Sequence, residues 1–290
     1  SAAGTADTIE TLAKVDFSIE EIKKIINKTN ACFVWGGALG LAPVDDKIIK
    51  IEKIAKIDST PQLLASILSK KISVGSKYIL IDIPCGKSAK ISKKQAKFLK
   101  KKFIILGKKF NLKISVVLTD GSEPIGNGIG PALEMNDVIK VLERNNPPKD
   151  LEDKSIFLAG KILELAGVSK FLTGEKLARE ILNSKKAYKK FEEIIHAQNG
   201  KIKKLNPAKF SATIFSENNF KISHIDNKLI NELARISGCP EDKFSGIYLF
   251  KKKGDFVKKG DKLLTIYSES EEKLLYSKKF YNQNKKLIII

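Results

Sequence analysis

The stretch Tyr78-Ile79-Leu80-Ile81-Asp82-Ile83-Pro84 is the strongest strand signal in this chain of 290 residues. Its apolar run has the length of a buried strand and is too short to cross a membrane. Helix-like segments flank it at residues 62–71 and 95–110, and a second strand-like run follows at residues 112–118. From residue 15 to about residue 200 helix-like and strand-like segments alternate, which is typical of an α/β domain.

The pattern changes near Pro207, where the predicted elements become shorter. Strand-like segments at residues 210–215 and 220–225 precede one predicted helix at residues 229–236. Glycine-containing turns and a strand-like run over residues 262–267 follow, which is a hairpin-rich pattern. We therefore predict a boundary between residues 198 and 209. It separates an α/β domain, residues 1–204, from a small carboxyl-terminal α+β domain, residues 205–290.

Three local signals lie ahead of the strongest strand. Ser18 and Glu21 have the spacing of a capping box and predict a helix over residues 22–27. Residues 31–35 have the composition of a short buried strand that ends at a pair of glycines. The run Asp58-Ser59-Thr60-Pro61 predicts the start of the next helix, because proline is favoured in a first helical turn.

Composition narrows the class of protein. Hydrophobic residues make up 42% and charged residues 30% of the chain, which indicates a globular protein. No apolar run suits a membrane helix, residues 1–16 do not resemble a signal peptide, and the three cysteines are widely spaced. His196 and His224 lack neighbouring ligands, so we expect no metal site. These features favour a cytoplasmic protein that is not bound to membranes.

A net charge of +20 raises the question of nucleic-acid binding. Arg144, Arg179 and Arg235 are the only arginines, although arginine is the residue best suited to base and phosphate recognition. The lysines recur along most predicted helices, as in Lys100-Lys101-Lys102, and this favours solvated helix faces. RNA or another acidic partner remains an alternative.

Small and hydroxyl-bearing residues open the chain, in Ser1-Ala2-Ala3-Gly4-Thr5 before a predicted helix start. Such a stretch lets backbone N–H groups approach a phosphate, although an ordinary helix cap has the same composition. Further along, Ser66 and Lys70 lie four residues apart, so they project within about 40° of each other on one helix. From spacing alone, a Lys70 that reaches solvent is the favoured interpretation.

The loop after the strongest strand, Pro84-Cys85-Gly86-Lys87-Ser88-Ala89-Lys90, ends like a phosphate-binding P-loop. The motif needs a glycine five residues before Gly86, and Ile81 stands there, so a Walker site is excluded. Lys87 and Lys90 can still bind an anion. Cys85 adjoins these lysines, and a lowered thiol pKa would make it reactive, but we assign no base to it.

The loop over residues 120–130 contains Gly126, Gly128 and Gly130. The glycine spacing differs from that of dinucleotide-binding proteins, so a nicotinamide site is not expected. A loop that is either mobile or closely packed at the edge of a cleft fits better.

Six segments, taken together, resemble archaeal AMP phosphorylases of the thymidine/pyrimidine nucleoside phosphorylase family. In chain order they are residues 1–10, 32–37, 42–46, 120–134, 226–228 and 246–249. The resemblance implies a mixed β-sheet domain of the nucleoside phosphorylase type, flanked by helices, and a small carboxyl-terminal α+β domain. It also implies phosphorolysis of a nucleoside 5′-monophosphate, which yields a free base and ribose 1,5-bisphosphate.

The same resemblance implies roles for individual residues. Asp58 would be the proton donor to the departing base. Contacts with phosphate, nucleotide or substrate would come from Ser1, Thr5, Ser66, Lys70 and Lys90. Inorganic phosphate would be a co-substrate, and no cofactor or metal is implied.

Two departures from the family bear on function. Ile51 stands where pyrimidine-specific members carry an arginine for the base, which favours a nucleotide substrate over a pyrimidine nucleoside. Family members also carry an amino-terminal domain and a phosphate-holding glycine loop ahead of the segment that matches Ser1. We therefore expect a second polypeptide to complete the enzyme, whose complex could form homo-oligomers. A thymidine-type phosphorylase, or a non-catalytic remnant that binds RNA or an acidic partner, remains an alternative.

Overall fold

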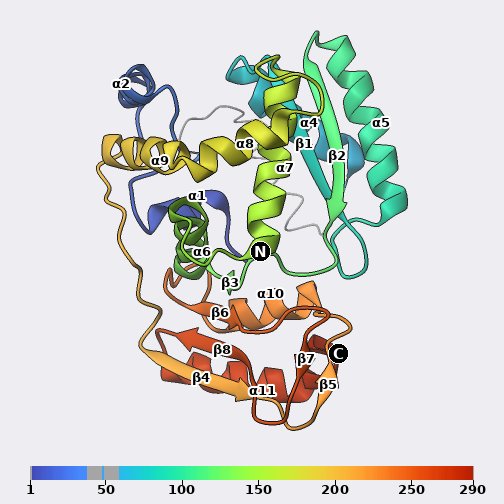
Figure 1. The fold of residues 1–290 in the computed structure, drawn as a ribbon, viewed down its shortest axis with the longest axis vertical. Coiled ribbons are helices and arrows are strands. Elements are labelled where there is room, and N and C mark those ends of the chain that lie inside the picture. Colours follow the sequence, from blue (N-terminus) through green and yellow to red (C-terminus); the bar gives the residue numbers. More distant parts are fainter. Residues whose placement is uncertain (1, 38–47, 49–58, 290) are drawn as a thin grey trace.

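The computed structural model describes residues 2–37, 48 and 59–289. Ser1, Ile51, Asp58 and the segment 42–46 lie outside the described residues. Figure 1 shows two parts, one with helices around a pair of parallel strands and the other with an antiparallel sheet near the carboxyl terminus. The predicted class, an α/β region followed by a small α+β region, is confirmed.

The strongest strand signal forms β1 (Tyr78–Cys85), which pairs in parallel with β2 (Lys113–Asp120). Helix α5 (Lys93–Lys109) connects them, as expected for a parallel crossover. Alternate β1 residues, Ile79, Ile81 and Ile83, are buried in a cluster with residues of α4 (Thr60–Ser73) and α5. All four predictions of helix and strand in this region are confirmed.

Further helices surround this unit, and most follow the predicted boundaries closely. They are α1 (Thr5–Glu10), α2 (Ile19–Thr29), α6 (Pro131–Glu143), α7 (Lys149–Leu165), α8 (Gly174–Asn183) and α9 (Lys186–Ala197). Helix α7 lies beside β1, and α1 packs against α6 (Figure 1). The predicted capping box is present, because Ser18 Oγ accepts the Glu21 N–H and Glu21 Oε2 accepts the Ser18 N–H.

The strand predicted at residues 31–35 is wrong, because this described segment contains no strand and Trp35 is 55% exposed. The backbone of this segment instead forms hydrogen bonds with the buried side-chain amide of Gln198. Gln198 Oε1 accepts the Phe33 N–H at 2.7 Å, and Gln198 Nε2 donates to the carbonyls of Phe33 and Lys14. A single glutamine therefore satisfies backbone groups that a neighbouring strand would otherwise satisfy.

The carboxyl-terminal part contains a four-stranded antiparallel sheet in the order β3-β6-β8-β4. Its strands are β3 (Gly128–Ile129), β6 (Gly246–Leu249), β8 (Lys262–Ser268) and β4 (Phe210–Phe215). Strand β3 comes from the loop that follows β2, so the sheet uses residues from both sides of the boundary predicted at 204/205. That domain boundary stays a prediction.

A second, short pair joins β5 (Phe220–Lys221) to β7 (Phe256–Val257), so the strand predicted over residues 220–225 is shorter than expected. Helix α10 (Asn227–Ile236) agrees with the prediction. Helix α11 (Glu271–Ile288) is not predicted from the sequence, yet it packs on β8 and β4.

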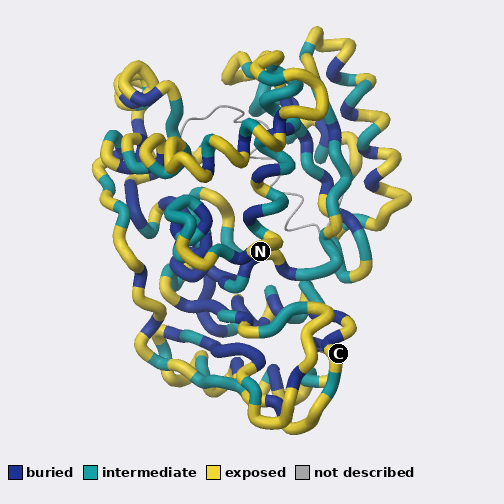
Figure 2. Tube along the Cα trace, in the orientation of Figure 1, coloured by how far each residue is buried: buried dark blue, intermediate teal, exposed yellow. Residues whose placement is uncertain are grey.

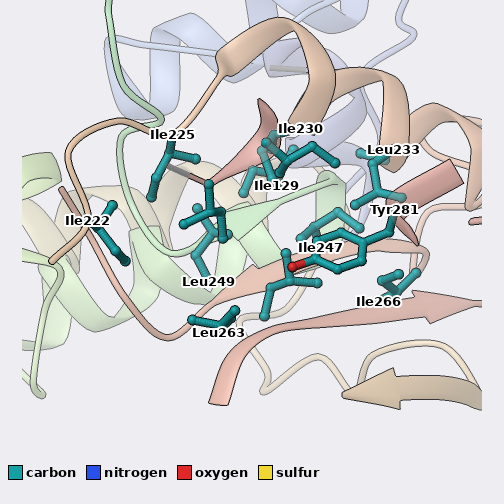
Figure 3. Close-up of a cluster of buried hydrophobic side chains, with 14 of the residues drawn as sticks. Ile129, Ile222, Ile225, Ile230, Leu233, Ile247, Leu249, Leu263, Ile266 and Tyr281 are labelled. Carbon is teal, nitrogen blue, oxygen red and sulfur yellow. The ribbon is translucent and has the colours of Figure 1, made fainter. Parts of the chain in front are cut away.

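The core of this part brings together distant pieces of chain (Figure 3). Ile129 comes from β3, Ile230 and Leu233 from α10, and Tyr281 from α11. Burial raises the pKa of the Tyr281 hydroxyl to about 12, which indicates a dry environment. Within the part of the chain that the structure describes, we find no helix with the length and apolar character needed to cross a membrane.

Candidate active site

The segment that opens the chain forms the start of α1. Gly4 is the N-cap, and its N–H donates to Asp7 Oδ2 at 2.8 Å, while Thr5 is the exposed first residue of the helix. Lys243, from the carboxyl-terminal part, lies 3.1 Å from Asp7 Oδ1 and 2.7 Å from Glu10 Oε2. The carboxyl-terminal part therefore holds the helix that begins with Thr5.

Ser66 and Lys70 lie on α4, which begins after Ser59 with Pro61 in its first turn, as predicted. Both side chains are half-buried beside Leu64 and Leu68, which pack into the core under β1. Neither of the two polar residues is without an interaction partner, and the interpretation of Lys70 as a lysine that reaches solvent stays a prediction. Asp58, which the sequence places just before this helix, is outside the described residues.

Lys90 is exposed on the loop between β1 and α5, at the carboxyl end of the parallel pair. The same loop is held to the one after β2, because Ser88 Oγ donates to the Ser122 carbonyl at 2.9 Å. Gly86 has a φ of 147°, and a Cβ there would collide with Ser122 Oγ, so glycine is required. Cys85 does not point to the lysines; it is buried in the cluster under β1.

The loop after β2 starts with Asp120, whose position is opposite Cys85 in the parallel register. Asp120 Oδ1 accepts the Ser122 N–H at 2.9 Å, and this bond lowers the pKa of the carboxyl group. Lys253 and Lys93 contribute smaller electrostatic effects in the same direction. A permanently negative group therefore lies at the end of β2, next to the loop that carries Lys90.

Glu123 joins this loop to the carboxyl-terminal part. Its Oε1 lies 2.6 Å from Nδ1 of the buried His224, and its Oε2 accepts the Ile225 N–H at 2.8 Å. Because an ionised carboxylate only accepts hydrogen bonds, the pair assigns a ring proton to Nδ1. Nε2 of the same ring faces Asp226 Oδ2 at 4.0 Å. His224 is thus a buried histidine whose ring is held by Glu123.

Asn227, the first residue of α10, strengthens this junction. Its Nδ2 donates to the Gly121 carbonyl at 2.6 Å, and its N–H donates to Ser88 Oγ at 3.4 Å. Asp226 caps the same helix by accepting the N–H groups of Lys228 and Leu229. The Asp226-Asn227-Lys228 segment therefore braces both loops at the carboxyl ends of β1 and β2 (Figure 1).

The loop over residues 120–130, for which the sequence predicts either mobility or close packing, is closely packed. The buried carboxylate of Asp137 accepts the N–H groups of Asn127 and Gly128 at 2.6 and 2.8 Å. Lys252 donates to the carbonyls of Pro124 and Gly126 and pairs with Asp150. The loop is a connection between the two parts of the molecule.

The structure places the predicted site residues on three elements. Ser66 and Lys70 share one stripe of α4, whereas Thr5 begins α1 and Lys90 lies on the β1–α5 loop. Within the described residues, no hydrogen bond or ion pair joins Thr5 or Lys90 to that stripe. Their predicted roles stay predictions. Sequence reasoning missed the bracing residues Glu123, Asp137 and Lys252, and the partners of Glu123 and Lys252 lie more than 100 residues away along the chain.

Comparison with known proteins relates this architecture to one group. A family model described as the pyrimidine nucleoside phosphorylase C-terminal domain matches residues 221–286. AMP phosphorylases from Thermococcus kodakarensis, Pyrococcus abyssi and Methanococcus aeolicus are each 46% identical to the chain over 279 residues. The alignments cover 94% of this chain and 56%, 56% and 55% of the relatives, so the chain spans a little more than half their length. Over nearly its whole length, the chain is therefore related in sequence to the carboxyl-terminal portion of the AMP phosphorylases.

Proposed function

We propose that this chain takes part in the phosphorolysis of nucleoside 5′-monophosphates, with AMP as the first candidate substrate. The observation that carries the proposal is the identity of 46% to proteins named AMP phosphorylase, spread over 279 residues. Because the chain spans 56% of the length of those relatives, the reaction is assigned to it together with a further part.

The proposed reaction makes one bond and breaks one. An oxygen of inorganic phosphate bonds to C1′ of the ribose while the C1′–N bond breaks, and its electron pair leaves with the base. The departing base needs a proton, which we assign to Asp58 as general acid. The negative charges of the two phosphates require preorganised hydrogen-bond donors and cations. The proposed ones are Ser1, Thr5, Ser66, Lys70 and Lys90.

The fold is compatible with this assignment. In open α/β sheets, ligands bind outside the carboxyl ends of the strands. The loops that follow β1 and β2 lie at those ends, and Lys90 is exposed on the first of them. Asn227, Ser88 and Glu123 hold both loops in place, so a ligand would meet a rigid edge. Lys90 is the residue that we propose for the 5′-phosphate.

The residue at position 51 bears on the choice between a nucleotide and a pyrimidine nucleoside as substrate. Ile51 cannot donate the hydrogen bonds with which an arginine would hold a pyrimidine, so a pyrimidine nucleoside should be a poor substrate. No metal or organic cofactor belongs to the proposal, in which phosphate is a co-substrate. A cytoplasmic location also belongs to the proposal.

The test uses the chain purified from its own cells with any polypeptide that accompanies it. AMP, adenosine and thymidine are each incubated with phosphate, and free base and ribose 1,5-bisphosphate are quantified by chromatography and phosphorus NMR. We expect base release from AMP, and mass spectrometry of the same sample should show which polypeptide carries the further part. Preference for thymidine would contradict the nucleotide assignment, and no release from any substrate would contradict phosphorolysis.

A further inference from the structure

Helix α5 carries charge of only one sign. Its sequence contains eight lysines and no aspartate or glutamate. The lysines are Lys93, Lys94, Lys97, Lys100, Lys101, Lys102, Lys108 and Lys109. Another long helix, α11, mixes lysines with Glu271 and Glu272. The lack of acidic residues therefore separates α5 from a helix face of mixed charge.

Many described lysines, those of α5 among them, form no ion pair with a described carboxylate, whereas some lysines elsewhere do. Elsewhere, Lys154 pairs with Asp82, Lys243 with Asp7, and Lys285 with Glu217. Across residues 2–37 and 59–289, none of the eight α5 lysines forms a salt bridge with a described carboxylate. Lys93 lies close enough to the carboxyl group of Asp120 to lower its pKa. The α5 lysines are thus available to solvent or to a partner.

Apolar residues lie among these lysines on the outer face. The inner face of α5, formed by Ala96, Leu99, Phe103 and Gly107, is buried. At 100° per residue, the opposite stripe reads Lys94, Phe98, Lys101, Ile105 and Lys108. Phe98 and Ile105 are each 51% exposed. Figures 1 and 2 show α5 at the edge of the molecule with its outer side exposed.

We propose that this outer face of α5 binds single-stranded nucleic acid. Lysines along a groove or ridge follow the phosphate backbone, and exposed aromatic rings between them stack on bases. Lys102 already lies over one face of the Phe98 ring, 5.3 Å from its centroid, which orients the ring among cations. The helix is about 26 Å long at 1.5 Å per residue, so it can contact several successive phosphates.

Two features of α5 define the type of binding. A helix that enters a membrane surface needs a free apolar face, and the apolar face of α5 is buried against β1 and β2. Bidentate recognition of bases uses arginine, and α5 has none. The surface therefore suits RNA or single-stranded DNA bound without sequence preference. This activity is independent of the phosphorolysis proposed above.

The test measures binding of the full chain, with any polypeptide that accompanies it, to fluorescein-labelled oligouridylate by anisotropy. The variant Lys94→Glu, Lys101→Glu, Lys108→Glu removes the outward cations. The control Lys278→Glu, Lys279→Glu, Lys286→Glu changes net charge equally at exposed lysines of α11. Circular dichroism verifies that both variants fold. A third variant, Phe98→Ala, leaves the charge unchanged and tests stacking.

We expect binding that weakens between about 50 and 200 mM salt, with a logarithmic slope of about −0.7 for each phosphate neutralised. The α5 charge variant should lose at least about tenfold in affinity, and its slope should fall in magnitude by about 2. Phe98→Ala should lose affinity with the slope kept, and the α11 control should resemble the wild type. Equal losses in both charge variants, no binding by the wild type, or binding to phosphatidylserine vesicles instead of RNA would overturn the proposal.

Discussion

The parallel pair β1–β2 and the four-stranded antiparallel sheet differ in how completely they are buried. In the antiparallel sheet, β8 contributes four consecutive buried residues, Leu263–Ile266, so both of its faces are covered. In the parallel pair, one face of β1 is buried by α4 and α5, while Leu80 and Asp82 on the other face are half-buried. There Asp82 accepts a hydrogen bond from Thr119 and pairs with Lys154 of α7.

This difference in burial suggests different roles for the two sheets, one in stability and one in ligand binding. A sheet that is buried on both faces offers apolar contacts and few polar groups, as the carboxyl-terminal core does. The parallel pair keeps polar side chains at its carboxyl ends, where loops with Lys90 and Asp120 are exposed. We infer that the antiparallel sheet mainly stabilises the fold and braces those loops, and that ligands bind at the parallel pair.

The largest expected effect on stability comes from the antiparallel core. Leu264 is 0% exposed, and Leu264→Ala should lower the free energy of unfolding by about 2–5 kcal/mol, because it leaves a cavity. Leu80→Ala removes the same atoms from the half-buried face of β1 and should cost roughly 1 kcal/mol. Urea unfolding measures both. Equal losses would contradict the difference between the two sheets.

A smaller effect is expected where the two sheets are joined. Glu123→Gln keeps the shape of the side chain but leaves one of two donors, on His224 or Ile225, without an acceptor. The cost should be about 1–3 kcal/mol in unfolding free energy, with faster amide exchange at Ile225. The control Glu217→Gln breaks a pair with Lys285 in which the carboxylate is 71% exposed, and should change neither. Unchanged exchange at Ile225 in Glu123→Gln would mean that this link does not brace the loops.

Much of the fold follows from local sequence patterns. The apolar run of β1, the cap at Ser18 and the proline at the start of α4 each act over a few residues, and all were predicted correctly. Local sequence patterns could not show that residues 31–35 do not form a strand. The backbone partner of this segment is Gln198, which is 165 residues from Phe33, so no local pattern shows that a side chain replaces a strand.

In the candidate site too, contacts between residues far apart in the sequence could not be predicted. The junction between Glu123 and His224 spans 101 residues of sequence, and the pairing of Asn227 with Gly121 spans 106. The proposed roles of Asp58, Ser66 and Lys90 rest on resemblance to a family, and for Lys70 spacing alone favours a solvent-facing side chain. The one-sided charge of α5 is visible in the sequence, whereas its outward direction and lack of ion pairs require the structure.

The central claim, phosphorolysis with Asp58 as the acid, is tested most directly by Asp58→Asn. Asparagine keeps the size of the side chain but cannot donate a carboxyl proton, so turnover of AMP should fall by about 10²–10⁴-fold while AMP still binds. Asp153→Asn is the matched control, since that carboxylate pairs with Lys149 at the surface of α7. Steady-state release of adenine in the presence of phosphate is the measurement. Loss in Asp58→Asn alone, with binding retained, is the predicted result; unchanged turnover in Asp58→Asn would contradict the account.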